Sequence, residues 1–427
     1  MAIVPDSLMV RLNDYPVGVL SRLPGNLVTF YFTQQFIDDP DRPTLSLGWF
    51  DAYRRLRTKL YSSSLGIVPP FFANLLPEGD LRRYVAHRAG VSTEDDFALL
   101  WLTGGDLPGA VTVVDPQGRP LPPPAAGLPA SGIPPSQMLR FSLAGVQLKF
   151  SAVENAYGGL TIPAQGIGGD WIVKLPSRHL ALVPENEYAM MCFAQDVGIE
   201  IPEIRLAELS TIEGLPAETA AFEGSALLVR RFDRGVDGAR VHIEDFNQIY
   251  RQAPKMKYDN RAFADIAGTI YQALGNEALI DFIHRLVFNV GIGNNDMHLK
   301  NWSLIYRDGR TPALAPVYDF VCTTVYLGHT QTGLALGSAR YFPEVTFEQF
   351  GRLAERARVS RGLVERAARE MVERMRNAWP ATRAMLPFEK LRTALEHQLA
   401  RVPIFASGEV RVTPGGTERE AAPEEVS

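Results

Sequence analysis

The 427-residue chain lacks the features that mark disulfide-rich, zinc-binding or membrane-spanning proteins. Its two cysteines, Cys192 and Cys322, are too few and too far apart for a disulfide scaffold or a zinc site, so we expect both to be packing residues. No apolar run is long enough to cross a bilayer, and the first residues lack the basic segment and apolar core of a signal peptide. We therefore expect a cytoplasmic protein with no membrane partner.

The chain also has no excess of basic residues. Lysine and arginine number 43 against 48 aspartates and glutamates, which gives a formal net charge of −5. A protein that covers DNA needs a dense basic face, so we expect DNA contact only through a partner. The densest basic cluster, residues 54–59, is short, and we expect it to be a solvated helix face rather than a DNA-binding arm.

With 46% apolar and 21% charged residues, the composition is that of an ordinary globular protein, and 427 residues are enough for two or three domains. Residues 1–110 mix β-like runs with helical stretches and form a predicted amino-terminal subdomain. Residues 111–138 are rich in proline and glycine and are a predicted linker or loop. A β-rich lobe is predicted over residues 139–233 and a mainly helical lobe over 234–406. The tail, residues 407–427, has few apolar residues, and we expect it to be disordered.

One helix of the second lobe leads into a polar segment. The helix is predicted from apolar residues at steps of four, three and four, which form one buried stripe: Leu279, Ile283, Leu286 and Val290. We expect it to end near Gly293. The next eight residues read Asn-Asn-Asp-Met-His-Leu-Lys-Asn and are called loop 294–301 below.

Loop 294–301, together with Asp319, contains the side chains that phosphoryl transfer requires. Such a site needs a carboxylate for the attacking hydroxyl, an amide oxygen and a second carboxylate for Mg²⁺, and a cation for the moving charge. Asp296 can be the first carboxylate, Lys300 the cation, and Asn301 and Asp319 the metal ligands. The five-residue step from Asp296 to Asn301 is also that of the protein-kinase sequence H-R-D-x-x-x-x-N. The sequence therefore predicts a kinase.

This loop departs from ordinary eukaryotic-type kinases. Asn294 and Asn295 replace the His-Arg that precedes the catalytic aspartate, and Val321 replaces the glycine of Asp-Phe-Gly. The chain also lacks both standard phosphate-binding sequences, G-x-G-x-x-G and G-x-x-x-x-G-K-[ST]. We therefore expect a kinase of another branch.

Three upstream segments fit a nucleotide-binding lobe. The turn at residues 142–149 could wrap phosphates with its backbone N–H groups or be a plain hairpin turn. Lys174 lies in a short apolar strand and needs an anion, which ATP or Glu187 of the next predicted helix could supply. The alternative is an edge-strand lysine that faces water. The strand-like run 227–234 ends at the expected hinge, where backbone groups of residues 230–232 could meet the adenine.

In this order the motifs resemble those of the HipA family of serine/threonine kinases, the toxin half of bacterial toxin–antitoxin pairs. The resemblance covers nearly the full chain. It is carried by residues 142–149, Lys174, Asn-Glu-Tyr at 186–188, Arg-Phe-Asp-Arg at 231–234, loop 294–301 and Tyr318-Asp319, and by residues 71–79 and 108–111 of the amino-terminal subdomain.

The resemblance implies an α+β, two-lobed kinase-like fold, similar to HipA and to phosphatidylinositol 3/4-kinases, with an extra amino-terminal subdomain and a mainly helical carboxy-terminal lobe. It implies ATP and Mg²⁺ as cofactors, with Asp296 as catalytic base, Lys300 also catalytic, and Asn301 and Asp319 as metal ligands. Self-phosphorylation is implied at Ser142. The implied nucleotide contacts are Ala144, Gly145, Val146, Gln147, Leu148, Lys149, Lys174, Glu187, Arg230, Arg231, Phe232, His298, Asn301, Tyr318 and Asp319.

The resemblance also implies partners. These are a HipB-like helix-turn-helix antitoxin, operator DNA contacted mainly through that antitoxin, and a protein substrate such as an aminoacyl-tRNA synthetase. Some relatives carry glutamate at the positions of Leu148 and Arg230, so we expect both residues to change ATP affinity rather than chemistry. Two alternatives stay open: a small-molecule or lipid kinase on the same fold, and a non-catalytic corepressor subunit.

Overall fold

The computed structural model describes residues 4–121, 149–154, 160–161 and 169–406, with short gaps at 52, 60, 64, 178, 216–218, 220–221, 236–237 and 329. Several predictions concern residues outside these ranges. They are the loop residues 144–148, the phosphorylation site Ser142, most of the predicted linker and the tail 407–427.

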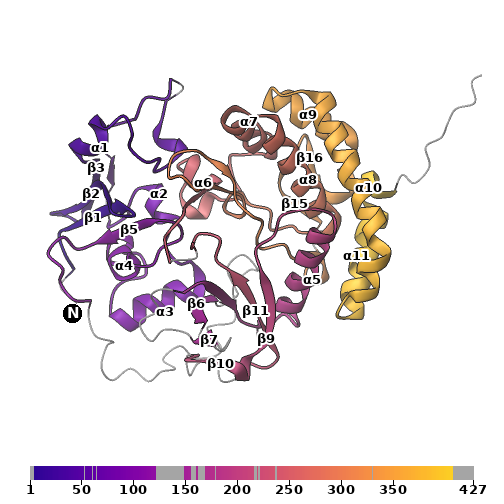
Figure 1. Ribbon diagram of the computed structural model, residues 1–427, viewed down its shortest axis with the longest axis horizontal. Coiled ribbons are helices and arrows are strands. Elements are labelled where there is room, and N and C mark those ends of the chain that lie inside the picture. The colour runs from indigo at the N-terminus through magenta and orange to yellow at the C-terminus, as the bar shows by residue number, and fades with distance from the viewer. Residues whose placement is uncertain are drawn as a thin grey trace, which may run out of the picture.

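The amino-terminal part is built on a five-stranded antiparallel sheet in the order β4-β3-β2-β1-β5 (Figure 1). Val10 and Phe30 are among its buried residues, and a cluster of aromatic rings fills the space between sheet and helices. The elements are β1 (Ser7–Leu12), β2 (Tyr15–Leu23), β3 (Leu27–Phe32), α1 (Gln34–Asp38), β4 (Tyr61–Ser63), α2 (Pro70–Ala73), α3 (Gly79–Ala89), α4 (Asp96–Thr103) and β5 (Val111–Val114).

A second sheet of six strands follows, in the order β10-β7-β6-β8-β11-β9. Its pairs are antiparallel except β7 with β10, and helix α5 packs against β11 and β9. The sheet has a small core of its own around Trp171, Val173 and Leu228. The elements are β6 (Lys149–Glu154), β7 (Leu160–Thr161), β8 (Trp171–Lys174), α5 (Val183–Asp196), β9 (Ile204–Glu208), β10 (Ile212–Glu213) and β11 (Ser225–Arg230).

The carboxy-terminal part is mainly helical, with α8 in contact with α7, α10 and α11 (Figure 1). Three short strands and one hairpin complete it. The elements are β12 (His242–Asp245), α6 (Phe246–Ile249), α7 (Phe263–Leu274), α8 (Asn276–Ile292), β13 (Ser303–Tyr306), β14 (Ala313–Leu314), β15 (Gln331–Leu336), β16 (Ala339–Tyr341), α9 (Phe347–Ala357), α10 (Arg361–Met385), α11 (Glu389–Arg401) and α12 (Pro403–Ala406).

Helix α8 confirms the predicted helix before loop 294–301. All four residues of the predicted stripe, from Leu279 to Val290, are fully buried. Gly293 ends the helix with a left-handed φ of 68°, and a side chain there would meet Thr324 Oγ1 at 2.6 Å. Only glycine therefore fits this turn without strain.

The architecture is α+β, with an amino-terminal sheet subdomain and a mainly helical carboxy-terminal region, as predicted. Among the helices in the described ranges, none combines the length and the apolar character that a bilayer crossing requires.

The prediction of a helix face over residues 54–59 is wrong. Here Asp51 accepts hydrogen bonds from the backbone of Tyr53 and Arg55, which holds a tight turn. Arg54 has a left-handed φ of 59°, and Leu56 bridges back to Phe50 in antiparallel fashion. The aspartate side chain thus competes with helical hydrogen bonding.

Candidate active site

Asn294 connects loop 294–301 by hydrogen bonds to the segment that carries Asp319. The Asn294 amide donates to Asn289 Oδ1 (2.8 Å) and to the carbonyl of Asp319 (3.2 Å). Its Oδ1 accepts from the backbone N–H of Asp296 (3.0 Å). Since a buried amide is costly unless it is hydrogen-bonded, these contacts fix the two carboxylate-bearing segments relative to each other.

Lys174 joins the two lobes. It lies at the end of β8, is almost fully buried, and its ammonium binds Glu187 Oε1 of α5 (2.5 Å) and Asp319 Oδ1. Burial alone would lower the pKa of Lys174, but the facing Asp319 and Glu187 outweigh it and raise the pKa. Lys174 is therefore a fixed cation between one carboxylate of the sheet lobe and one of the helical lobe.

Asp296 is held by a tyrosine. Its Oδ1 accepts a hydrogen bond from the hydroxyl of Tyr258 and lies 3.9 Å from His298 Nε2. Burial raises the pKa of Asp296 to about 6, against the opposing effects of the Tyr258 hydrogen bond and of Lys257. A carboxylate of this kind is a better proton acceptor than an exposed aspartate and suits a general base.

Asn301 and Asp319 fit the ligand preferences of Mg²⁺. The Asn301 Nδ2 donates to the carbonyl of Asp296 (2.8 Å), which leaves the amide oxygen as the ligand atom. The Asp319 carboxylate is 33% exposed, and its backbone is left-handed with a φ of 56°. Mg²⁺ commonly takes one or two carboxylates together with waters and substrate phosphates. No group of three or more His, Cys, Asp or Glu side chains placed to bind a metal occurs in the part of the chain that the structure describes.

Lys300 points toward the amino-terminal subdomain. Its ammonium binds Glu78 and donates to the carbonyl of Asn74 (3.2 Å). The other carboxylate oxygen of Glu78 binds Lys257 (3.2 Å). Burial alone would raise the pKa of Glu78, but the two lysines outweigh it and lower the pKa to about 2. Lys300, the predicted cation for the moving charge, is thus ion-paired with Glu78.

Tyr318 contacts both loop 294–301 and the segment that follows β11. Its hydroxyl donates to the carbonyl of Lys300 (2.8 Å) and lies 2.5 Å from Ser303 Oγ. Its ring lies 6.0 Å from the ring of Phe232. Two predicted nucleotide contacts, Phe232 and Tyr318, are therefore brought together.

His298 is buried in loop 294–301 and packs edge-on against the ring of Tyr258 at 5.1 Å. Burial, together with the charges of Lys257 and Lys300, lowers the pKa of His298 to about 3. The imidazole is therefore neutral at physiological pH, and its Nδ1 has no hydrogen-bond partner among the described residues.

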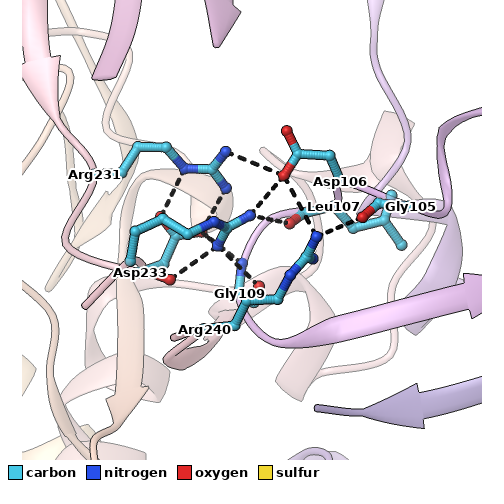
Figure 2. Close-up of polar contacts among 8 residues, drawn as sticks. Gly105, Asp106, Leu107, Gly109, Arg231, Asp233 and Arg240 are labelled. Atoms are coloured by element: carbon cyan, nitrogen blue, oxygen red, sulfur yellow. Dashed lines mark hydrogen bonds and ion pairs between the residues drawn. The ribbon is translucent and has the colours of Figure 1, made fainter. Parts of the chain in front are cut away.

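Arg231 faces the amino-terminal subdomain (Figure 2). Its guanidinium binds both carboxylate oxygens of Asp233 (2.9 and 2.8 Å) and lies 3.4 Å from Asp106. Arg234 binds the same Asp106 at 2.7 Å. The backbone N–H of Arg231 donates to the carbonyl of Asp170 (2.7 Å). The side chain and N–H of Arg231 are thus used within the protein.

The strand register of the second sheet places two further predicted nucleotide contacts, Lys149 and Arg230, at opposite ends of β8. Lys149 begins β6 and stands opposite Lys174 in the register of the two strands. Arg230 stands opposite Trp171, at the other end of β8, and its guanidinium packs over that indole at 5.7 Å. Lys149 is therefore brought to the site, whereas Arg230 lies at its rim.

Sequence reasoning missed Glu78, Lys257 and Tyr258. Glu78 meets Lys300 across 222 positions of sequence, and Tyr258 meets Asp296 across 38. Lys257 and Tyr258 lie in an irregular segment without periodicity. One signal was available, because Glu78 lies within residues 71–79, which carry part of the family resemblance.

Two family models and several known proteins match this chain. Residues 8–114 match the model of the HipA N-terminal domain, and residues 141–379 that of the HipA-like C-terminal domain. "Putative kinase Y4dM" of Sinorhizobium fredii is 46% identical over 89% of this chain and 93% of its own length. "Serine/threonine-protein kinase toxin HipA" of Shewanella oneidensis is 29% identical over 61% of this chain and 64% of its own length.

A solved structure supports the fold. The complex of HipA, HipB and operator DNA from Shewanella oneidensis MR-1 contains a chain that matches with a TM-score of 0.72 at 22% identity, over 93% of this chain and 96% of that chain. The two domain matches and the 46% identical relative establish more than the fold. This chain belongs to the HipA family of kinases.

Proposed function

We propose that the chain is an ATP- and Mg²⁺-dependent serine/threonine protein kinase that acts in the cytoplasm as the growth-inhibiting toxin of a HipBA-like pair. The observation that carries the proposal is the position of Lys174 between Glu187 and Asp319. A lysine on a strand, paired with a helix glutamate and placed beside the metal-binding aspartate, is what an active protein kinase requires. A non-catalytic scaffold has no physical need for these charges.

The roles of the side chains follow from their positions. Lys174 contacts the phosphates of ATP, and Asn301 with Asp319 holds Mg²⁺, which neutralises phosphate charge when it is bound. Asp296 accepts the proton of the attacking hydroxyl. The hydroxyl of Tyr258 already donates to Asp296 and marks the direction from which an acceptor hydroxyl would approach.

Ser142 is proposed as the site of self-phosphorylation. Phosphate there would add up to about two negative charges to the chain shortly before Lys149, which stands opposite Lys174. These charges would repel the phosphates of ATP, so the reaction would limit itself. The proposed partners are a HipB-like helix-turn-helix antitoxin, operator DNA through that antitoxin, and a protein substrate of the aminoacyl-tRNA synthetase type.

The experiment is inducible expression of the parent chain beside Asp296→Asn, with mass spectrometry of phosphorylated proteins from both cultures. The proposal predicts that growth stops with the parent alone, that a protein gains phosphate on serine or threonine, and that the antitoxin restores growth. Arrest by both variants would contradict it in favour of a non-catalytic role. A phosphorylated small molecule or lipid, without a modified protein, would contradict the choice of substrate.

A further inference from the structure

A carboxylate of the amino-terminal subdomain reaches the catalytic loop of the helical lobe. We infer that Glu78 is a positioning residue for phosphoryl transfer, because it holds Lys300 and Lys257 in place and so makes the amino-terminal subdomain part of the active site. The inference rests on the proposed kinase function and adds to it a residue for which the family motifs give no role.

The two oxygens of Glu78 serve two different lysines. One binds the Lys300 ammonium and the other binds that of Lys257 at 3.2 Å. Neither lysine has another carboxylate within 4.0 Å in the described ranges. Glu78 is therefore the counterion that both cations share, and its low pKa keeps it ionised at physiological pH.

Each lysine is next to a residue of the proposed active site. Lys300 lies directly before the metal ligand Asn301. Lys257 precedes Tyr258, whose hydroxyl binds Asp296. The two segments also touch through their backbones, since the N–H of Leu299 donates to the carbonyl of Lys257 (3.1 Å). Glu78 thus forms ion pairs with both loop 294–301, which carries the proposed base Asp296, and the segment of Lys257 and Tyr258, which contacts it.

The segment that carries Glu78 is itself anchored to the helical lobe by buried amides. Asn74 donates to the carbonyl of Gln252 (2.9 Å) and accepts from Asn247 (2.8 Å). Gln248 donates to the carbonyl of Phe71 (3.1 Å). Because buried hydrogen bonds of this kind fix geometry, the position of Glu78 is set by the fold rather than by a mobile surface contact.

Loss of the Glu78 charge would leave two neighbouring cations without a counterion. Their repulsion would displace loop 294–301, and Lys257 would be able to turn toward Asp296 and compete with the acceptor hydroxyl. Lys174 pairs with Glu187 and Asp319 rather than with Glu78, so ATP binding would be affected much less. The expected defect is therefore in the transfer step.

The experiment compares Glu78→Gln, Glu78→Asp and the control Glu94→Gln, an exposed glutamate of the same subdomain, in the full chain. The rate of self-phosphorylation is measured against ATP concentration. We expect Glu78→Gln to lower the rate at saturating ATP by about 10- to 100-fold, as for a misplaced catalytic group, with a half-saturating ATP concentration close to that of the parent. Glu78→Asp, which keeps the charge, should recover part of the rate.

A second readout does not depend on activity. Hydrogen exchange of the Leu299 amide, and of the residues around it, should be faster in Glu78→Gln and unchanged in Glu94→Gln. An inactive parent would count against the proposed function, and the exchange data would still decide the positioning role. Unchanged exchange, an unchanged saturated rate, or a Glu78→Asp variant no better than Glu78→Gln would overturn the inference.

Discussion

The hydroxyl of Tyr258 donates a hydrogen bond to Oδ1 of Asp296, so it occupies one of the positions that an acceptor hydroxyl would need at this proposed base. The Tyr258 ring is held by its edge contact with His298. An acceptor must displace this hydroxyl or share the carboxylate with it.

Tyr258→Phe removes this competitor without removing the ring. A hydrogen bond of this kind contributes on the order of 1 kcal/mol net, so we expect self-phosphorylation to become about three- to tenfold faster at the same ATP concentration. Initial rates of phosphate incorporation measure this directly. A slower rate would mean that Tyr258 supports Asp296. An unchanged rate would mean that Tyr258 does not compete with the acceptor hydroxyl.

Lys174→Met should cost both activity and stability. The change leaves Glu187 buried without its cation, and breaking such a pair costs about 3–5 kcal/mol. We expect a drop of that order in the free energy of unfolding, measured by urea denaturation, and no detectable phosphate transfer. The double variant Lys174→Met, Glu187→Gln should recover part of the stability and none of the transfer, which separates the two roles of Lys174.

Asp106 should matter for the attachment of the amino-terminal subdomain. It lies within 4.0 Å of Arg231, Arg234 and Arg240 in the cluster of Figure 2, and its side chain is buried. Asp106→Asn removes a negative charge that faces all three buried or partly buried arginines. We therefore expect the free energy of unfolding to fall by about 3 kcal/mol.

The matched control for Asp106 is Asp41→Asn. Asp41 pairs with Arg310 across the same two parts of the chain, but both side chains are well exposed. Exposed ion pairs contribute little, so its effect should be several times smaller. Equal effects of Asp106→Asn and Asp41→Asn would contradict the account.

Glu244 makes stability depend on pH. It is fully buried, accepts from the Leu47 backbone (2.9 Å) and from Tyr306, and burial raises its pKa to about 7 from 4.5. Below about pH 4.5 the carboxyl is protonated in both the folded and the unfolded chain. Between pH 4.5 and 7 the folded chain binds more protons, so the free energy of unfolding falls as the pH rises through this window.

Glu244→Gln should remove that fall. The free energy of unfolding of the variant minus that of the parent should rise by about 3 kcal/mol from pH 4.5 to 7. His242 titrates in the opposite sense, since burial lowers its pKa to about 4, and this contribution is common to both proteins. A difference that stays constant across the window would show that Glu244 is already ionised in the folded chain.

Contacts between residues close together in the chain were predicted better than contacts between distant segments. Asp296 and Asn301 are five residues apart on one loop, and Lys174 lies 13 residues before Glu187, so local spacing was enough to pair them. The register of β6 also brings Lys149 to Lys174, as the predicted phosphate loop requires.

Contacts between distant segments could not be predicted in this way. Lys300 was assigned to the moving charge, but the structure places its ammonium on Glu78, which no periodicity or spacing connects to it. Backbone groups of residues 230–232 were expected to meet the adenine. The side chain of Arg231 meets Asp106 of the amino-terminal subdomain as well as Asp233, and no local spacing connects Arg231 to Asp106.

The measurement that tests the central claim most directly is incubation of the purified chain with labelled ATP and Mg²⁺, beside Asp296→Asn, followed by mapping of the phosphate. Starting protein must be shown to be unphosphorylated and able to bind ATP. We predict label on Ser142 in the parent and none in Asp296→Asn. Equal labelling of both proteins, or no label on either, would contradict the assignment of Asp296 as the base of a self-phosphorylating kinase.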